Sequence, residues 1–179
     1  YRVYLEWLNS LITHEQIRLN RFVESPLAHP TVMFRRELVD THGGYRDGDF
    51  PEDYELWLRW LAAGVRMCKV PHVLYRWADF PKRLSRTDPR YRDRAFYRLK
   101  AEYLAQWLSK RVTCPVFVWG AGRTTRRRAE MLASRGVAIH AWIDIDPAKV
   151  GRTLGGRRVI PPAELPQPGN AFVLAYVGS

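Results

Sequence analysis

Three consecutive segments between residues 115 and 144 restrict the fold of this chain more than any other feature. PVFVWG is an apolar run that ends in glycine, GRTTRRRAEMLASRG has helical periodicity, and VAIHAWID is a second apolar run. Two short strands joined through a helix form a parallel unit, because parallel neighbours need a long crossover connection. The sequence therefore predicts an α/β fold.

The segments around this unit complete a map of expected elements. The N-terminal segment has helical periodicity with a polar break near Thr13, where a second helix begins. TVMFRR is interpreted as a short buried strand that continues into a helix, and this helix ends at Gly43 and Gly44. Residues 50–63 are interpreted as a further helix. VRMCKV, HVLYRW, GGRRVI and AFVLAYV are interpreted as strands, and the segment from Asp88 to the LAQWL sequence as a long helix that Asp88 caps.

The pattern changes from mainly helical to strand, helix, strand between residues 108 and 115. We therefore expect two domains, residues 1–110 and residues 111–179. The chain begins without methionine and stops in a predicted strand, so we expect both ends to be cut from a larger protein and the second domain to be truncated.

Composition indicates a folded chain, since 46% of its 179 residues are apolar and 13% are aromatic. No apolar run approaches the roughly 20 residues that a membrane-spanning helix needs. Cys68 and Cys114 lie far apart and have no histidine or cysteine at metal-ligand spacing, so neither a metal site nor a disulfide framework is indicated. We expect a cytoplasmic protein.

A formal charge of +11 admits three classes of partner: nucleic acid, phosphorylated substrates, or an anionic membrane surface at the inner face of the membrane. A general preference for arginine in the source proteome explains the charge equally well. The arginines are spread along the chain and form no stripe with interleaved aromatic residues. We therefore expect no nucleic-acid partner.

A carboxylate pair, Glu52 and Asp53, directly follows a proline at the start of the helix expected over residues 50–63. Tyr54, Trp57, Leu58 and Leu61 have the spacing of a buried stripe, and Asp53 lies on its border, one turn before Trp57. Glu52 instead aligns with Glu55 and Arg59 on a charged face. Acids are favoured in a first helical turn by the helix dipole alone, so a structural role remains open beside a catalytic one.

The order HPTVMFRREL, GGY, PEDYELWLRW, VPHVLYRW and RLSR resembles the second half of the catalytic domain of glycosyltransferase family 2, over roughly residues 25 to 100. The resemblance implies a partial GT-A fold, in which a mixed sheet packs with helices. It implies inverting transfer from a nucleotide-sugar donor to a carbohydrate or lipid-linked acceptor. Asp53 matches the general base of that family, and Glu52 is its partner in the motif.

The chain departs from the family pattern in two respects. The DxD motif of the nucleotide-binding half is not in this sequence, so the ligands of the Mg or Mn ion that the resemblance implies are expected mostly outside the chain. The YRWADFPKRLS loop carries Asp79 or Phe80 where many members have histidine. Arg76, Arg83 and Ser85 are the local candidates for donor or acceptor contacts, because guanidinium and hydroxyl groups donate to phosphate oxygens.

This chain by itself is expected to be inactive. Surface that the nucleotide-binding half would bury is expected to favour contacts between copies of the chain, which makes a homo-oligomer one expected state.

The second candidate site is the glycine turn VWGAGRTTRRR. Gly120 ends a predicted strand and Gly122 opens a helix, as in the first two positions of the dinucleotide fingerprint, but Thr125 takes the third position. Asp144 closes the next strand, where a ribose-binding acid belongs. The residues Arg126 to Arg128 are expected on the exposed face of the helix.

This segment resembles the Rossmann-like nucleotide-binding domain at the start of bacterial sugar acetyltransferases. Nucleotide or NAD binding and a scaffold that binds nothing both stay open. Two rival functions also stay open: an NAD(P)-dependent enzyme or nucleotide sensor, and a nucleic-acid binder. A tyrosine–lysine or cysteine–histidine pair near the glycine turn would favour the first rival, and the sequence shows none.

Overall fold

The computed structural model describes residues 2–76 and 82–176, which form two compact units, residues 1–103 and residues 104–179. The α/β class predicted from the sequence is confirmed. The units meet in the chain between Tyr103 and Leu104, within helix α6 (Asp93–Arg111), whereas the sequence places the boundary near the end of this helix. Among the described residues, no helix combines the length and the apolar character that crossing a membrane requires.

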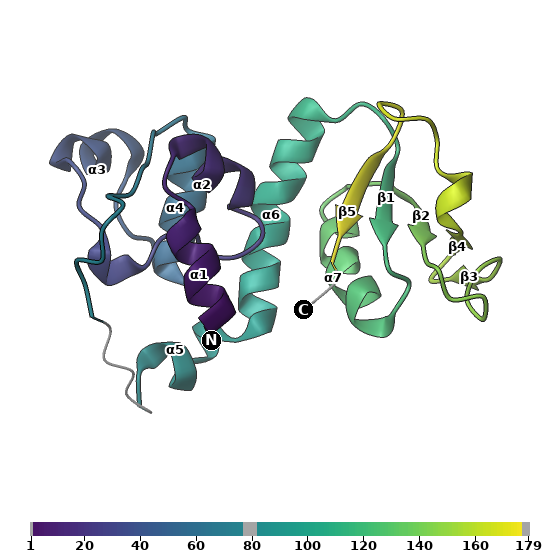
Figure 1. The fold of residues 1–179 in the computed structure, drawn as a ribbon, viewed down its shortest axis with the longest axis horizontal. Coiled ribbons are helices and arrows are strands. Elements are labelled where there is room, and N and C mark those ends of the chain that lie inside the picture. The colour runs from purple at the N-terminus through teal and green to yellow at the C-terminus, as the bar shows by residue number, and fades with distance from the viewer. Residues whose placement is uncertain (1, 77–81, 177–179) are drawn as a thin grey trace. The chain divides into compact units, whose positions relative to one another are not determined.

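All the regular secondary structure among the described residues of the first unit is helical (Figure 1). Its elements are α1 (Arg2–Ser10), α2 (His14–Asn20), η1 (His29–Thr31), α3 (Arg36–His42), α4 (Glu52–Ala62), α5 (Leu84–Thr87), η2 (Pro89–Tyr91) and the first part of α6. The predicted break before α2 is confirmed, because Thr13 and Gln16 form a reciprocal capping box. Asp88 caps η2 and not the long helix, which begins at Asp93.

Helix α4 is the centre of the first unit. Trp57 and Trp60 pack with Ile17 of α2 and other apolar residues on one side. Tyr54 and Leu58 pack with apolar residues of α6 on the other side. Because apolar partners cover two faces of α4, seven of its 11 residues are buried.

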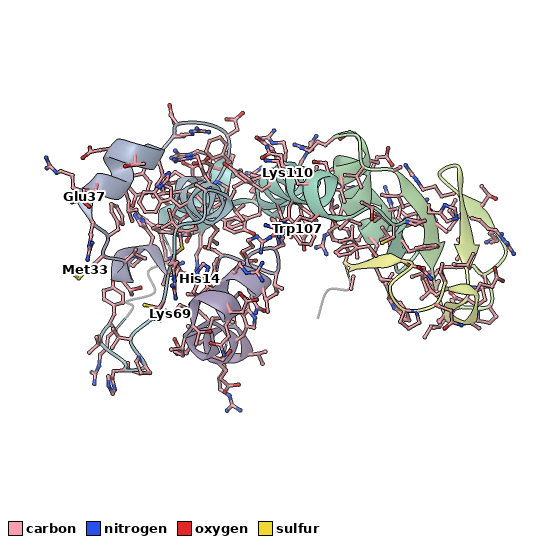
Figure 2. The ribbon with its side chains drawn as sticks, turned by 90° about the horizontal axis from the view of Figure 1, so that it is seen from above. His14, Met33, Glu37, Lys69, Trp107 and Lys110 are labelled. Atoms are coloured by element: carbon pink, nitrogen blue, oxygen red, sulfur yellow. The ribbon has the colours of Figure 1, made fainter. Side chains whose placement is uncertain are left out.

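Three expected strands of the first unit do not form. In the TVMFRR segment, Met33 is 96% exposed and its side chain points away from the helices (Figure 2). Residues 65–70 run beside the start of α2, where Met67 N donates to His14 Nδ1 at 3.3 Å and Lys69 N donates to Ile12 O at 2.8 Å. Residues 72–76 are exposed and irregular. A strand needs a hydrogen-bonded neighbour, and the described part of this unit offers none.

The second unit contains the sheet, whose strand order is β3-β4-β2-β1-β5. The strands are β1 (Val116–Trp119), β2 (Ile139–Ile143), β3 (Thr153–Leu154), β4 (Arg157–Ile160) and β5 (Phe172–Ala175). Strands β4, β2, β1 and β5 are parallel, and β3 pairs antiparallel with β4. The predicted strand, helix, strand unit is confirmed as β1, α7 (Arg123–Ala133) and β2.

Alternating residues of the strands point to opposite faces of this sheet. Val118 and Trp142 face the side that α7 covers, together with Ala129 of that helix. Phe117 and Ile143 face the other side, where residues near η3 (Pro162–Glu164) pack. Both faces are therefore covered, as expected for a parallel sheet, and the carboxyl ends of β1 and β2 lie at one edge beside the glycine turn.

Candidate functional site

Asp53 lies in the first turn of α4, directly before the buried Tyr54. Its Oδ1 accepts a hydrogen bond from Tyr54 N at 2.7 Å, and its side chain is partly buried. Burial raises the pKa of Asp53 above its ordinary value, although the hydrogen bond from Tyr54 opposes this shift. A carboxylate that is partly desolvated and still reachable is suited to accept a proton.

Glu52 has a different environment from its neighbour. Both of its carboxylate oxygens accept from the hydroxyl of Tyr91, at 2.6 and 2.7 Å. Burial and this hydrogen bond raise the pKa of Tyr91, so the phenol keeps its proton. The sequence predicts a charged face for Glu52, whereas its partner in the structure is a phenol. This contact ties η2 to the head of α4.

Two further side chains lie at the same end of α4, and sequence reasoning missed both. His29 Nε2 and the Tyr45 hydroxyl are 2.7 Å apart, and their rings meet edge to face with centroids 5.3 Å apart. The His29 ring also lies 6.4 Å from the ring of Trp57, one helical turn after Asp53. Burial and the negative charges of Asp53 and Glu52 raise the pKa of Tyr45.

The sequence did carry a signal for this pair. His29 stands in the HPT segment and Tyr45 in GGY, two of the motif segments. Neither residue belongs to a periodic apolar stripe, so the sequence does not assign either of them to a core. Both are therefore candidate site residues.

The expected charged face of α4 is wrong for Glu55, which is only 2% exposed. Its carboxylate accepts from Arg59 Nε at 3.0 Å and from the Tyr103 hydroxyl at 2.6 Å. Arg59 also donates to the carbonyl groups of His42, Gly43 and Gly44, the last at 2.6 Å. This buried network fixes the loop before Tyr45 to α4.

The donor or acceptor candidates lie after α4 in the chain. Arg83 precedes α5, and its Nε donates to Ser85 Oγ at 2.9 Å. Arg76 is exposed. Asp79 and Phe80, which stand where many family members have histidine, lie outside the described residues. The Glu52–Tyr91 hydrogen bond ties the segment that follows α5 to the carboxylate pair.

The glycine turn has the expected backbone arrangement. Gly120 directly follows β1 with a φ of 93°, a conformation that favours glycine, and a Cβ there would lie 3.3 Å from Thr125 Oγ1. Gly122 caps α7 with a φ of −65°, and a Cβ there would meet no heavy atom within 4 Å. The first amides of α7 lack intrahelical partners, so the turn presents donors beside open space.

Asp144 is buried at the end of β2 and is bound into this turn. Its Oδ2 accepts from Ala121 N at 2.9 Å, and its Oδ1 accepts from Asp146 N at 3.0 Å. Lys149 Nζ lies 3.4 Å from Oδ2. Burial would raise the pKa of Asp144, but the two N–H groups and Lys149 outweigh burial and hold the pKa below its ordinary value.

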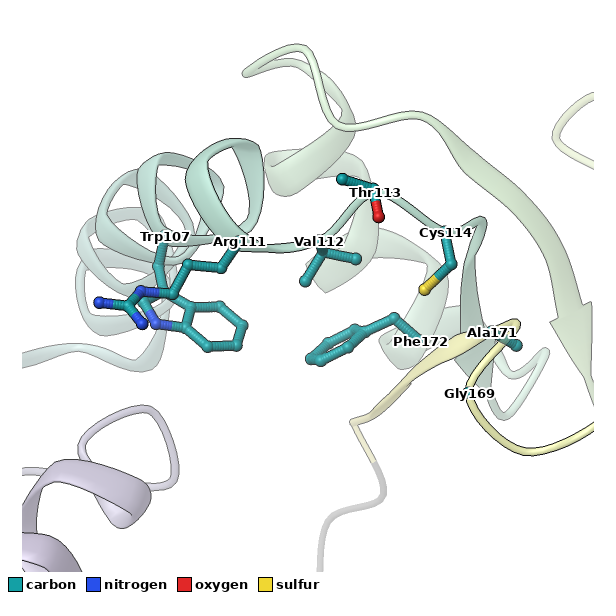
Figure 3. Close-up of a pocket in the computed structure, with 8 residues that line it drawn as sticks. All are labelled: Trp107, Arg111, Val112, Thr113, Cys114, Gly169, Ala171 and Phe172. Carbon is teal, nitrogen blue, oxygen red and sulfur yellow. The ribbon is translucent and has the colours of Figure 1, made fainter.

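The second unit also has a pocket of about 590 Å³ at the other end of the sheet (Figure 3). Trp107 and Phe172 line it with ring centroids 5.8 Å apart, and Arg111 and Cys114 contribute a guanidinium and a thiol. Cys114 shortly precedes β1 and Phe172 begins β5. The pocket therefore lies at the amino ends of these strands, whereas ligands of open parallel sheets bind at carboxyl ends. No predicted site residue lines it.

Three curated glycosyltransferases are similar to parts of this chain. The amylovoran biosynthesis glycosyltransferase AmsE of Erwinia amylovora is 35% identical over 54 residues, which are 30% of this chain and 20% of that protein. The O-antigen biosynthesis glycosyltransferase WbnJ of Escherichia coli is 25% identical over 113 residues, which are 61% and 44% of the two chains. An uncharacterized glycosyltransferase of Haemophilus influenzae is 39% identical over 49 residues, which are 27% and 18%.

This chain thus spans less than half the length of each of these three relatives. No protein-family model matches it. No solved structure matches it either.

Proposed function

We propose that this chain supplies the acceptor side of a family 2 glycosyltransferase with a GT-A fold, and that Asp53 is the general base of an inverting transfer. The environment of Asp53 carries the proposal: a partly buried carboxylate at the head of a rigid, buried helix. Similarity to three glycosyltransferases supports the reaction class. The nucleotide-sugar donor and the carbohydrate or lipid-linked acceptor are part of the proposal.

In the proposed reaction, an acceptor hydroxyl oxygen attacks the anomeric carbon of the donor sugar. An Asp53 oxygen takes the proton of that hydroxyl, and the bond between the sugar and the phosphate breaks. The nucleoside diphosphate leaves with the bonding electron pair, and attack from the opposite side inverts the anomeric centre. Burial raises the pKa of Asp53, which makes its ionised carboxylate a stronger base toward that proton.

The described residues of this chain do not form a metal site. Within residues 2–76 and 82–176, no group of three or more His, Cys, Asp and Glu side chains is placed to hold an ion. The Mg or Mn ion that family 2 implies would neutralise the diphosphate, with ligands mostly outside this chain.

Glu52 has a positioning role in this proposal. Its hydrogen bonds to Tyr91 hold η2, and with it the end of the segment that carries Arg83 and Ser85, against the head of α4. Arg83, Ser85 and the exposed Arg76 are proposed to meet the donor diphosphate or the acceptor. Glu52 is engaged by a phenol, which leaves Asp53 as the carboxylate available for the proton.

The test is turnover of the protein as its gene encodes it, with UDP-, GDP- and dTDP-sugars as donors and cell-envelope glycolipids as acceptors. Asp53→Asn should lower turnover by roughly 10²- to 10⁴-fold, the usual cost of a lost general base. Glu52→Gln is the matched control, because its amide oxygen still accepts from Tyr91, and it should retain most activity. An inactive Glu52→Gln beside an active Asp53→Asn would reverse the assignment.

For the second unit we propose a Rossmann-like domain whose glycine turn is built around the Asp144 carboxylate. Asp144 is engaged by Ala121, Asp146 and Lys149, which favours a structural role for this acid over contact with a ribose. The open space beside Gly122 favours a phosphate on the first amides of α7. A nucleotide or NAD bound there would therefore be held through its phosphates.

A further inference from the structure

We propose that His29 and Tyr45 form a specificity-determining pair that receives the pyranose ring of the acceptor beside Asp53. The inference rests on the proposed function, since it assigns acceptor-binding residues to the same site. Neither residue is required for proton transfer, and both would act by placing the acceptor hydroxyl at Asp53.

The position of the pair is the first argument. The His29 ring lies edge to face with Tyr45 and close to Trp57, whose side chain follows Asp53 by one turn of α4. The Tyr45 hydroxyl lies 2.7 Å from His29 Nε2, so the phenol is held beside the same ring. His29 and Tyr45 thus belong to the same end of α4 as the proposed base.

The second argument is that contacts with α4 hold the loop that carries Tyr45 in place. The guanidinium of Arg59 donates to the carbonyl groups of His42, Gly43 and Gly44, and Trp60 Nε1 donates to Gly43 O at 3.1 Å. These contacts anchor the loop that carries Tyr45. A site fixed by packing and hydrogen bonds binds with less loss of conformational entropy than a mobile loop does.

The third argument is that the side chains of His29 and Tyr45 are exposed and have groups that can bind a sugar. Tyr45 is 47% exposed and His29 is also exposed, although each is held by the other. Tyrosine combines an apolar ring with a polar end, which suits the C–H face and the hydroxyl groups of a sugar. The imidazole adds one donor or acceptor at its second nitrogen. A carboxylate, a phenol and an imidazole together match a polyhydroxylated ring better than they match a lipid chain.

The pair is tested by saturation-transfer NMR of the full chain with methyl glycosides of glucose, galactose and N-acetylglucosamine as probes. At least one probe should bind with millimolar affinity. Tyr45→Phe and His29→Gln should each weaken binding by about 2- to 10-fold, the range for one lost neutral hydrogen bond. The double variant should be little worse than either single variant, because the two residues act as one unit.

Matched controls exist in the chain. Tyr75 is also 47% exposed and His72 is exposed, both on the segment after α4, so Tyr75→Phe and His72→Gln should leave binding unchanged. Thermal unfolding of all variants separates lost binding from lost folding. If every glycoside fails to bind, or if binding is equal in the pair variants and the controls, the pair has no role in recognition. The proposed function would survive that result, because it depends on turnover in Asp53→Asn.

Discussion

The acids of α4 differ because of their neighbours and not because of their spacing. Periodicity placed Asp53 at the border of the buried stripe, and the structure shows it partly buried. The same pattern placed Glu55 on a charged face with Arg59; the two do pair, but Glu55 is buried. A helical period shows only which residues share a face; it does not show that α6 brings Tyr103 over the second face. A single sequence therefore predicted the position of Asp53 but missed the network around Glu55.

Asp53 should lower the stability of the fold at neutral pH. Its pKa is raised in the folded state, so the unfolded chain loses this proton first as pH increases. The folded state is then destabilised once pH passes the unfolded pKa, near 4, and the cost is complete above the folded pKa. Asp53→Asn should unfold at a higher temperature than the parent at pH 7, and the gain should vanish near pH 3.

Glu52→Gln is the control for this comparison, measured by circular dichroism at both pH values. Its carboxylate is hydrogen-bonded to Tyr91, and the substitution should bring no comparable gain at pH 7. A lower unfolding temperature for Asp53→Asn at pH 7 would show that the ionised carboxylate stabilises the fold.

At the scale of elements, the prediction succeeded where a segment has its partners within the chain. Strands β1, β2, β4 and β5 pair with one another, and their apolar runs were recognised. The runs at residues 31–36, 65–70 and 72–77 have similar composition, but their described residues find no strand to pair with. An apolar run indicates a preference for extended backbone, but a sheet forms only where a second strand is available to pair with it.

The two glycines of the turn after β1 should respond differently to alanine. Gly120→Ala should lower the free energy of unfolding by about 1–2 kcal/mol, since it forces a residue with a Cβ into a left-handed conformation. That Cβ would also lie 3.3 Å from Thr125 Oγ1. Gly122→Ala adds a Cβ in open space at an ordinary φ and should be tolerated. Urea unfolding followed by the fluorescence of Trp119 and Trp142 measures both.

The same turn allows a ligand test. Calorimetry with NAD, NADP and nucleotide sugars should detect binding that Gly122→Val abolishes, if a phosphate occupies the first amides of α7. Gly122→Ala is the smaller control in the same open space. Binding that survives Gly122→Val would leave the turn as scaffold.

At the scale of the whole molecule, several of the arginines behind the formal charge of +11 are engaged in contacts within the chain. Arg59 is paired with Glu55, Arg90 with Asp88 and Arg157 with Glu130. Arg126 donates to the carbonyl of Ala121 in the glycine turn. Arginines in every part of the chain thus serve internal contacts, which fits their scattered distribution in the sequence.

Nucleic acid should therefore bind only weakly and without sequence preference. Affinity that comes from charge alone lies at roughly 10⁻⁴ to 10⁻⁶ M at physiological salt, and it falls as salt displaces the protein from the phosphates. Fluorescence anisotropy with labelled duplexes and single strands of unrelated sequence should give dissociation constants in this range for all of them. Doubling the salt concentration should weaken the binding of every one of these nucleic acids to a similar degree. Nanomolar binding to one sequence and not to its scrambled control would require arginines that converge on one surface, and would make nucleic acid a specific partner.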